Sequence, residues 1–333
     1  GRTKPGFDVP RKGDSSSSTS ARSVAGASDA PVRLVRVEFL DARRLLAMVH
    51  GARSAAIARV TATELEWTPL APTLEDVGPI SHAVMCDGQV ALAGPRGIVL
   101  LDPATNQRRK LTDLAGVSDL VSAGKRLLFS DGRFVWVLDA DGAAPREVMD
   151  LGPPTPRRSL VLALSPDGAE AVVLVVESDH IIRDASAYGL HLAAAPEPPG
   201  TAFRLDLPLG MTRKSAAMST DGRVAFGGDS FSLQVWTAGS NHTEALDVGM
   251  TLGLPSLHSL AFSPRGRTVY AASQTSKAHM KNELIAWTPG GAARRLERSA
   301  PVSSLAVSAD GLLLAVGTYD GKVEVWVVGD DVE

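Results

Sequence analysis

The clearest fold signal in the chain is residues 300–328, APVSSLAVSADGLLLAVGTYDGKVEVWVV. It contains three apolar runs, at residues 302–307, 312–317 and 322–328, and each of the two turns between them contains Asp-Gly. Asp-Gly between alternating apolar runs is a strong hairpin signal, because glycine adopts a positive φ without steric cost. A three-stranded sheet cannot bury its own faces, so this unit predicts neighbours of the same kind.

Six weaker copies of the unit precede it. Their clearest marks are turns related to Ser-Pro-Asp-Gly, at residues 165–168, 219–222 and 263–266. The period is near the roughly 40–45 residues of a four-stranded propeller blade once two long predicted turns, at residues 177–187 and 273–282, are set aside. No segment shows a sustained apolar stripe at helical spacing. The sequence therefore predicts an all-β fold, a seven-bladed β-propeller of four-stranded antiparallel blades.

The domain organisation follows from the same pattern. Residues 1–30 are poor in apolar side chains and rich in serine, so we expect a flexible Ser-rich linker or tail there, with a covalently linked domain upstream. The seventh blade has only three predicted strands, and residues 21–27 are the expected source of the fourth. The propeller is predicted over residues 31–333, with blades at about 31–78, 79–115, 116–156, 157–211, 212–255, 256–299 and 300–328.

The composition argues against several classes of protein. A formal net charge of −3 argues against a general nucleic-acid or membrane-surface binder. The one cysteine, Cys86, excludes an intramolecular disulfide, and we expect it to be a buried apolar side chain. No apolar run is as long as the roughly 18 residues that a membrane helix needs. We expect a cytoplasmic protein of bacterial-type composition, with no cofactor and no metal.

The repeated hairpins resemble those of the WD-repeat β-propeller family. The matching residues are the Ser-Pro-Asp-Gly turn at 165–168 with its relatives, and the hairpin GTYDGKVEVW at residues 317–326. The family's Trp-Asp dipeptide is absent, because valine or threonine follows each matching tryptophan. The resemblance implies a rigid binding module, and in bacterial members such propellers often follow kinase, protease or ATPase domains as sensors.

Two kinds of residue in the predicted second-to-third-strand hairpins have expected structural roles. The turn aspartates should cap backbone N–H groups, as short carboxylate side chains do. The tryptophans should anchor the packing of the blades, because large aromatic side chains dominate core burial. These turn and anchor residues are Asp131, Trp136, Asp229, Trp236, Trp287, Asp320 and Trp326.

The predicted partner-binding face is the one on which the second-to-third-strand turns and the connections between blades emerge. Most predicted blades place a cation there, and arginines on a rim can bind carboxylate or phosphate groups bidentately. Two aromatic side chains at the same turns could anchor a partner. An ordinary solvated surface is the alternative, because aspartates lie on the same face. The candidate binding residues are Arg53, Arg96, Arg133, Arg157, Arg183, Arg213, Phe231, Lys277, Lys281, Tyr319 and Lys322.

The sequence contains no motif of a known catalytic site. A nucleophile elbow, a phosphate loop and a His-Glu-x-x-His motif are all absent, and the histidines lack metal-ligand spacing. The predicted first strands, nearest the propeller axis, are mostly small and apolar, which disfavours an enzyme. The favoured function is a non-catalytic propeller that binds a protein or peptide, acidic or phosphorylated, as a sensor or scaffold module of a larger multidomain protein. The alternatives are a lactonase-like, small-molecule or metal-dependent enzyme that uses the central channel, and a passive spacer.

Overall fold

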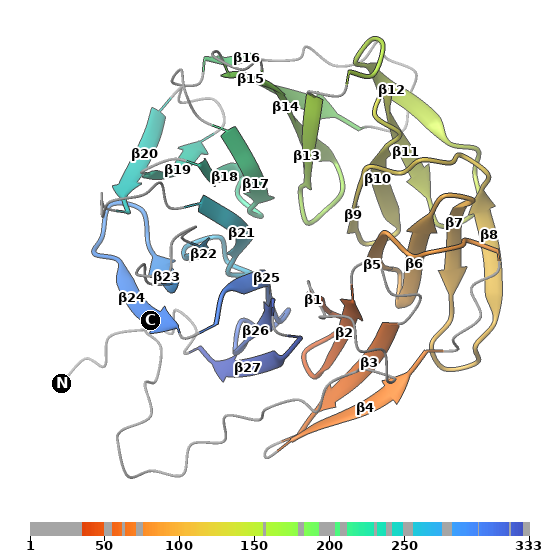
Figure 1. The fold of residues 1–333 in the computed structure, drawn as a ribbon, viewed down its shortest axis with the longest axis horizontal. Helices are drawn as coiled ribbons and strands as arrows, with labels where there is room; N and C mark the ends of the chain where they lie inside the picture. The colour runs from red at the N-terminus through yellow and green to blue at the C-terminus, as the bar shows by residue number, and fades with distance from the viewer. Residues whose placement is uncertain are drawn as a thin grey trace.

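The fold is a ring of β-sheets, seen in a computed structural model of the chain (Figure 1). The structure describes residues 35–49, 55–61, 64–70, 76–155, 158–178, 183–192, 204–206, 212–229, 232–237, 242–248, 256–274, 282–298, 300–319 and 321–328. Within these residues every regular element is a β-strand, and no helix is long and apolar enough to cross a membrane.

Seven blades make up the ring, and the strands of each are consecutive in the chain. The strands are, for blade 1, β1 (Val35–Phe39), β2 (Arg44–Val49), β3 (Ala55–Val60) and β4 (Leu65–Pro69); for blade 2, β5 (His82–Cys86), β6 (Gln89–Gly94), β7 (Gly97–Leu101) and β8 (Arg108–Thr112); for blade 3, β9 (Asp119–Ala123), β10 (Arg126–Ser130), β11 (Phe134–Asp139) and β12 (Arg146–Asp150); for blade 4, β13 (Arg158–Leu164), β14 (Glu170–Ser178), β15 (Arg183–His191) and β16 (Arg204–Asp206); for blade 5, β17 (Thr212–Met218), β18 (Arg223–Asp229), β19 (Ser232–Thr237) and β20 (His242–Asp247); for blade 6, β21 (Ser256–Phe262), β22 (Val269–Gln274), β23 (Asn282–Trp287) and β24 (Arg294–Arg298); and for blade 7, β25 (Val302–Val307), β26 (Leu313–Thr318) and β27 (Val323–Val327).

The architecture confirms the predicted seven-bladed propeller of antiparallel strands, with β1, β5, β9, β13, β17, β21 and β25 innermost (Figure 1). Blade 7 has three strands in the described part of the chain, and the expected fourth strand at residues 21–27 lies outside it, as does the predicted linker. The long turn predicted at residues 177–187 was wrong. There β14 and β15 continue their ladder, with Ser178 paired to Arg183, so only four residues separate the strands. The other long predicted turn, at 273–282, begins in β22 and ends at the start of β23.

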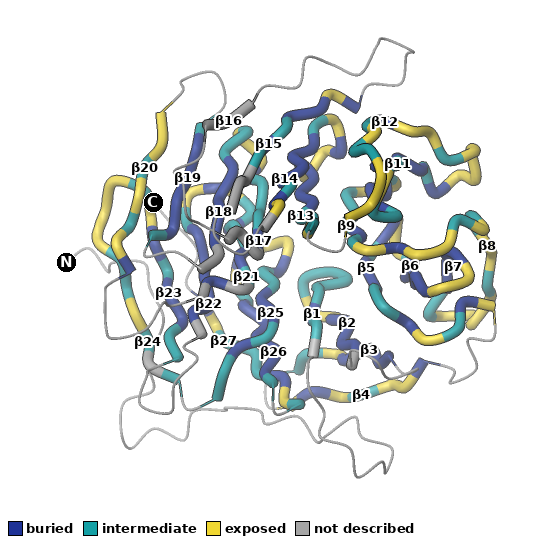
Figure 2. Tube along the Cα trace, turned by 45° about the horizontal axis from the view of Figure 1, so that its top comes forward, coloured by how far each residue is buried: buried dark blue, intermediate teal, exposed yellow. Residues whose placement is uncertain are grey.

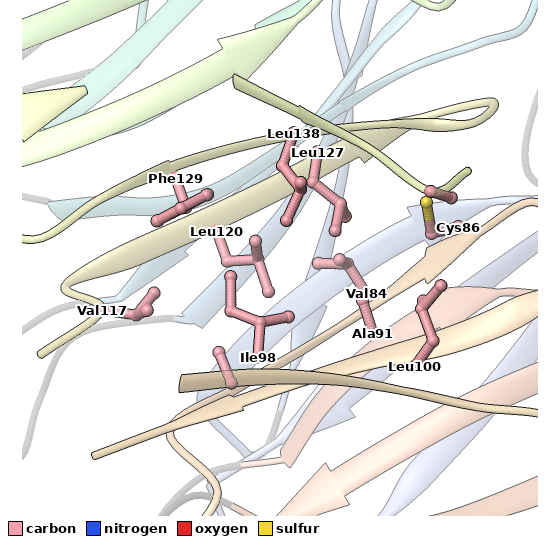
Figure 3. Close-up of a cluster of buried hydrophobic side chains, with 12 residues drawn as sticks. Val84, Cys86, Ala91, Ile98, Leu100, Val117, Leu120, Leu127, Phe129 and Leu138 are labelled. Atoms are coloured by element: carbon pink, nitrogen blue, oxygen red, sulfur yellow. The ribbon is translucent and has the colours of Figure 1, made fainter. Parts of the chain in front are cut away.

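The core consists of apolar layers between neighbouring blades. Successive side chains of a strand point to opposite faces of its sheet. In β10, Leu127 and Phe129 therefore pack against blade 2, while Leu128 packs against blade 4. All three are fully buried, and each such side chain contributes about 1.5–3 kcal/mol relative to an exposed one. Figure 3 shows the layer between blades 2 and 3, which includes Cys86 as the buried apolar residue that the sequence predicted. Exposed positions gather on outer strands such as β8 and β20 (Figure 2).

The repeated Ser-x-Asp-Gly sequence builds the turns between first and second strands. In blade 4 the Ser165 hydroxyl donates to Asp167 Oδ1 over 2.6 Å and accepts from Glu170 N over 2.9 Å. Asp167 Oδ1 also accepts from Ala169 N, and these hydrogen bonds hold the pKa of the Asp167 carboxyl below its usual value. Gly168 takes a φ of +70°, which glycine tolerates best. Ser308 repeats the contacts in blade 7, so this recurrent motif serves the turn itself.

Arginine side chains join neighbouring blades. Arg126 on β10 is an example, because its guanidinium binds Asp139 of its own blade and two backbone carbonyls of blade 4. Guanidinium groups suit such contacts, since their donors form a rigid planar fork. Arginine contacts to a neighbouring blade include those from Arg109 to Ala140 O, from Arg126 to Gly168 O and Leu192 O, from Arg223 to Gly266 O, from Arg295 to Asp247 O and Val248 O, and from Arg298 to the Glu324 carboxylate.

Candidate functional site

The face that carries the second-to-third-strand turns is described in part. Four of the predicted binding residues lie on it with their surroundings described, Arg96, Arg133, Tyr319 and Lys322. Arg183 and Arg213 lie in strands β15 and β17 and not in loops, because the ladders of blades 4 and 5 extend to them. Those that lie outside the described residues are Arg53, Arg157, Phe231, Lys277 and Lys281, and with them the turn residue Asp320. Asp229 ends β18, where it pairs with Ser256 of the next blade.

The turn of blade 3 shows how the chain fixes this face. Asp131 Oδ1 accepts hydrogen bonds from Arg133 N over 2.9 Å and from Phe134 N over 2.7 Å. Its other oxygen accepts from Trp136 Nε1 over 3.1 Å, so one carboxylate joins the turn to the third strand. The Ser130 hydroxyl accepts from Gly132 N over 3.0 Å, at a φ of +91°. The backbone of this turn is therefore fixed by hydrogen bonds within the blade itself.

Arg133 stands on that turn as an exposed cation. Its guanidinium lies over the Phe134 ring, 4.5 Å from the centroid, and Phe134 meets Trp136 edge to face with centroids 5.5 Å apart. Arg133 Nε is 3.7 Å from Asp150 Oδ1, a long and solvent-exposed ion pair that contributes little on its own. Stacking limits the rotamers of the arginine, and its donors stay accessible to an acidic group.

The turns of blades 2 and 7 add two more exposed cations, Arg96 and Lys322, to the same face. Arg96 N donates to Val77 O over 3.2 Å, which ties its turn to the connection before blade 2. Lys322 N donates to Thr318 Oγ1 over 3.1 Å. Tyr319 N donates to Pro301 O over 3.0 Å, and partial burial raises the pKa of the Tyr319 phenol.

The four third-strand tryptophans all lie between blades. Trp236 and Trp287 are buried in the layers between blades 4 and 5 and between blades 5 and 6, respectively. Trp136 and Trp326 pack half-buried against the layers between blades 2 and 3 and between blades 6 and 7. Trp326 Nε1 donates to Glu324 Oε2 over 3.2 Å, and Arg298 covers the indole at 4.9 Å.

A cavity of about 640 Å³ occupies the centre of the ring, and all seven innermost strands contribute to its wall. Hydrogen bonds at this wall run from one blade to the next. The Ser304 hydroxyl of blade 7 accepts from Val37 N of blade 1 over 3.0 Å, and the Ser259 hydroxyl of blade 6 accepts from Leu305 N over 2.8 Å. These bonds hold the innermost strands side by side and fix the width of the cavity.

Three charged side chains line one side of the cavity. Arg36 and Glu38 come from alternate positions of β1, and Asp119 begins β9. Asp119 accepts from Leu120 N over 2.9 Å and from Leu162 N of blade 4 over 2.8 Å. Burial raises the pKa of Asp119, although Arg36 and these amides oppose the shift. Burial likewise raises the pKa of Glu38 from 4.5 to about 7, against the charge of Arg36 and a hydrogen bond from the backbone of Met85.

The sequence reasoning missed this charged group. The expectation of small apolar side chains at the axis holds for most of β13, β17, β21 and β25, but it is wrong for β1 and β9. The signal was present, because Arg36 and Glu38 alternate with Val37 in a strand whose other face must be buried. Because Val37 packs in the layer between blades 1 and 7, Arg36 and Glu38 lie on the other face of β1, toward blade 2, where β1 borders the cavity.

Comparison with known proteins agrees with this architecture. A family model described as "WD domain, G-beta repeat" matches residues 293–327, which run from β24 through β27. Curated proteins yield no match. Among solved structures, the chain is similar to one titled "Crystal Structure of Mitotic Checkpoint Complex", with 16% identity and a TM-score of 0.65 over 97% of this chain and 96% of that chain. At this identity the likeness concerns the fold alone. The WD repeat matched at the end of the chain and the seven-bladed ring together support a WD-repeat β-propeller.

Proposed function

We propose that this propeller is a protein- or peptide-binding module, a sensor or scaffold of a larger multidomain protein, and that it binds through the face of the second-to-third-strand turns. The observation that carries the proposal is the set of exposed cations on that face, Arg96, Arg133 and Lys322, each on a turn whose backbone is hydrogen-bonded. Side chains on rigid turns lose little conformational entropy when a partner binds, so more of the energy of each contact contributes to the affinity.

The chemistry of the face favours an acidic partner. Arginine binds carboxylate or phosphate groups bidentately, and lysine binds them as a point charge. Arg133 over Phe134 combines a cation with an apolar surface, which is the kind of anchor found at interface hot spots. The similar solved structure comes from a mitotic checkpoint complex, so a propeller with this fold occurs in at least one multiprotein assembly.

The test is a selection from a random-peptide display library on the immobilised full chain. The proposal expects enriched peptides with net negative charge, and enrichment without acidic residues, or none at all, would overturn it. A synthetic peptide from the selection is then measured by fluorescence anisotropy against a charge-reversal variant, Arg96→Glu, Arg133→Glu and Lys322→Glu. We expect at least a tenfold loss of affinity, about 1.4 kcal/mol.

A matched variant on the opposite face controls for net charge. Arg43→Glu, Lys125→Glu and Arg265→Glu change the same number of exposed cations at first-to-second-strand turns. The proposal expects this variant to bind like the wild type at physiological salt, where charges farther apart than about 8 Å are screened. Equal loss in both variants would show that the total charge matters and that the face does not.

A further inference from the structure

The central cavity has the properties of a ligand site that is separate from the turn face. Its volume of about 640 Å³ lies within the roughly 300–1,000 Å³ of small-molecule pockets. One side of its wall carries charged side chains, and the other side is mainly apolar. The charged residues Arg36, Glu38 and Asp119 come from blades 1 and 3, while β13, β17, β21 and β25 contribute mainly apolar side chains and serine hydroxyls. Such pockets typically combine an apolar lining with a few polar groups that orient the ligand.

Arg36 has donors to spare for a ligand. Its guanidinium carries five N–H groups, and within the described residues it makes one hydrogen bond, from Nη2 to Leu120 O over 3.3 Å. Neither Glu38 nor Asp119 lies within 4.0 Å of the Arg36 guanidinium, so neither forms an ion pair with it. The positive charge of Arg36 nevertheless acts on both carboxyl groups and opposes the rise of their pKa values. A planar guanidinium with unused parallel donors is suited to a carboxylate, which it binds bidentately.

The carboxylates of Glu38 and Asp119 can accept hydrogen bonds from a ligand, whereas Arg36 can donate them. Asp119 is held by amides of β9 and β13, and Glu38 by the backbone of Met85 on β5. Each carboxylate oxygen has two acceptor sites, so both groups can still accept hydrogen bonds from a donor in the cavity. An ammonium group is the donor that also matches their charge.

We propose that the central cavity binds a small zwitterion, a free α-amino acid with an apolar side chain. Its carboxylate would bind Arg36, its ammonium group would bind Glu38, and its side chain would lie against the apolar wall of blades 4–7. A ligand with only a carboxylate would place an anion beside two carboxylates. A ligand with only an ammonium group would place a cation beside Arg36. The zwitterion alone satisfies both ends of the charged wall.

Protonation of Glu38 gives the proposal a second signature. The charged and titratable groups that interact with it are Arg36 on β1 and Cys86 on β5. Burial raises the pKa of the Cys86 thiol to about 12, so it stays neutral, and Arg36 stays charged. Because the pKa of Glu38 is raised to about 7, the free carboxyl is partly protonated near neutral pH. Binding of an ammonium group favours its ionised form and releases protons.

The test is isothermal titration calorimetry of the full chain with L-leucine, L-phenylalanine and L-tryptophan, each with two blocked relatives. The proposal expects binding of at least one free amino acid below about 10 mM and a loss of about tenfold or more for its N-acetyl form and for its amide. Titration near pH 7 in buffers of different ionisation heat should show proton release. No binding of any free amino acid, or equal binding of the blocked forms, would overturn the proposal.

Variants locate the binding in the cavity. Arg36→Met and Glu38→Gln remove one charge each with little change of volume, and each should weaken binding about tenfold or more. Lys125→Met removes an exposed cation from a first-to-second-strand turn and should bind as the wild type does. If Arg36→Met does not fold by circular dichroism, Glu38→Gln and the blocked ligands still decide the outcome. A folded Arg36→Met or Glu38→Gln with wild-type affinity would overturn the assignment.

Discussion

Arg126 is the strongest single test of how the blades hold together. Its Nε donates to Asp139 Oδ1 over 2.8 Å, and its Nη1 donates to Gly168 O and to Leu192 O, each over 2.9 Å. The side chain is 21% exposed, so these contacts form largely away from water. Arg126→Met keeps the aliphatic stem and removes two hydrogen bonds to blade 4 and two to Asp139 of blade 3.

The expected cost can be worked from these contacts. A hydrogen bond to a charged group contributes about 1.5–3 kcal/mol, but contributions from one side chain are not additive. Asp139 is 39% exposed and regains water when the arginine is removed, which reduces the loss further. The Gly168 and Leu192 carbonyls of blade 4 are partly buried, and the substitution leaves them without their charged hydrogen-bond donor. We expect Arg126→Met to lower the free energy of unfolding by about 2–4 kcal/mol and Arg126→Lys by about 1–2 kcal/mol.

The measurement is urea unfolding followed by tryptophan fluorescence, with the melting temperature as a second readout. Lys125→Met is the matched control, because the Lys125 side chain is 71% exposed and its Nζ lies 3.8 Å from Asp87 Oδ2. It should change stability by less than about 0.5 kcal/mol. An Arg126→Met chain as stable as that control would refute the view that arginines join the blades.

Three further predictions concern other parts of the ring. Because burial raises the pKa of Glu38 from 4.5 to about 7, folding favours its protonated form, and this stability is present below pH 4.5 and lost as the pH rises through about 7. Glu38→Gln should therefore raise the unfolding free energy by about 1–3 kcal/mol at pH 8 and by little at pH 4.5, and a pH-independent effect would contradict this. Gly97→Ala should be strongly destabilising in thermal melts, since its Cβ would lie 2.1 Å from Thr112 O at a φ of +117°, whereas Gly88→Ala, with open space at a φ of +75°, should cost only about 1 kcal/mol; similar losses would be the opposing result. Removal of residues 1–30 should lower the melting temperature by several degrees if that segment supplies the fourth strand of blade 7, and an unchanged melt would exclude it.

The turn residues show what could be predicted without the structure. Ser165, Asp167 and Gly168 interact within a few positions of one another, so their hydrogen bonds and the positive φ follow from local chemistry. The role expected for Asp131 follows from the same logic, because its partners are two to five residues away. The length of the hairpin of blade 4 was mispredicted because continued pairing of β14 and β15 prevailed over the polar composition of the segment.

The repeated sheets and the ring could be predicted from the alternation of apolar runs and Asp-Gly turns along the chain. These depend on side-chain period and turn chemistry, which act over a few residues. The folded ring was needed to show that Arg126 bridges blades 3 and 4 and that Arg36, Glu38 and Asp119 line one cavity. Arg36 and the Leu120 carbonyl are 84 residues apart in the chain. A contact of that span depends on the register and closure of the whole ring, which no local pattern contains.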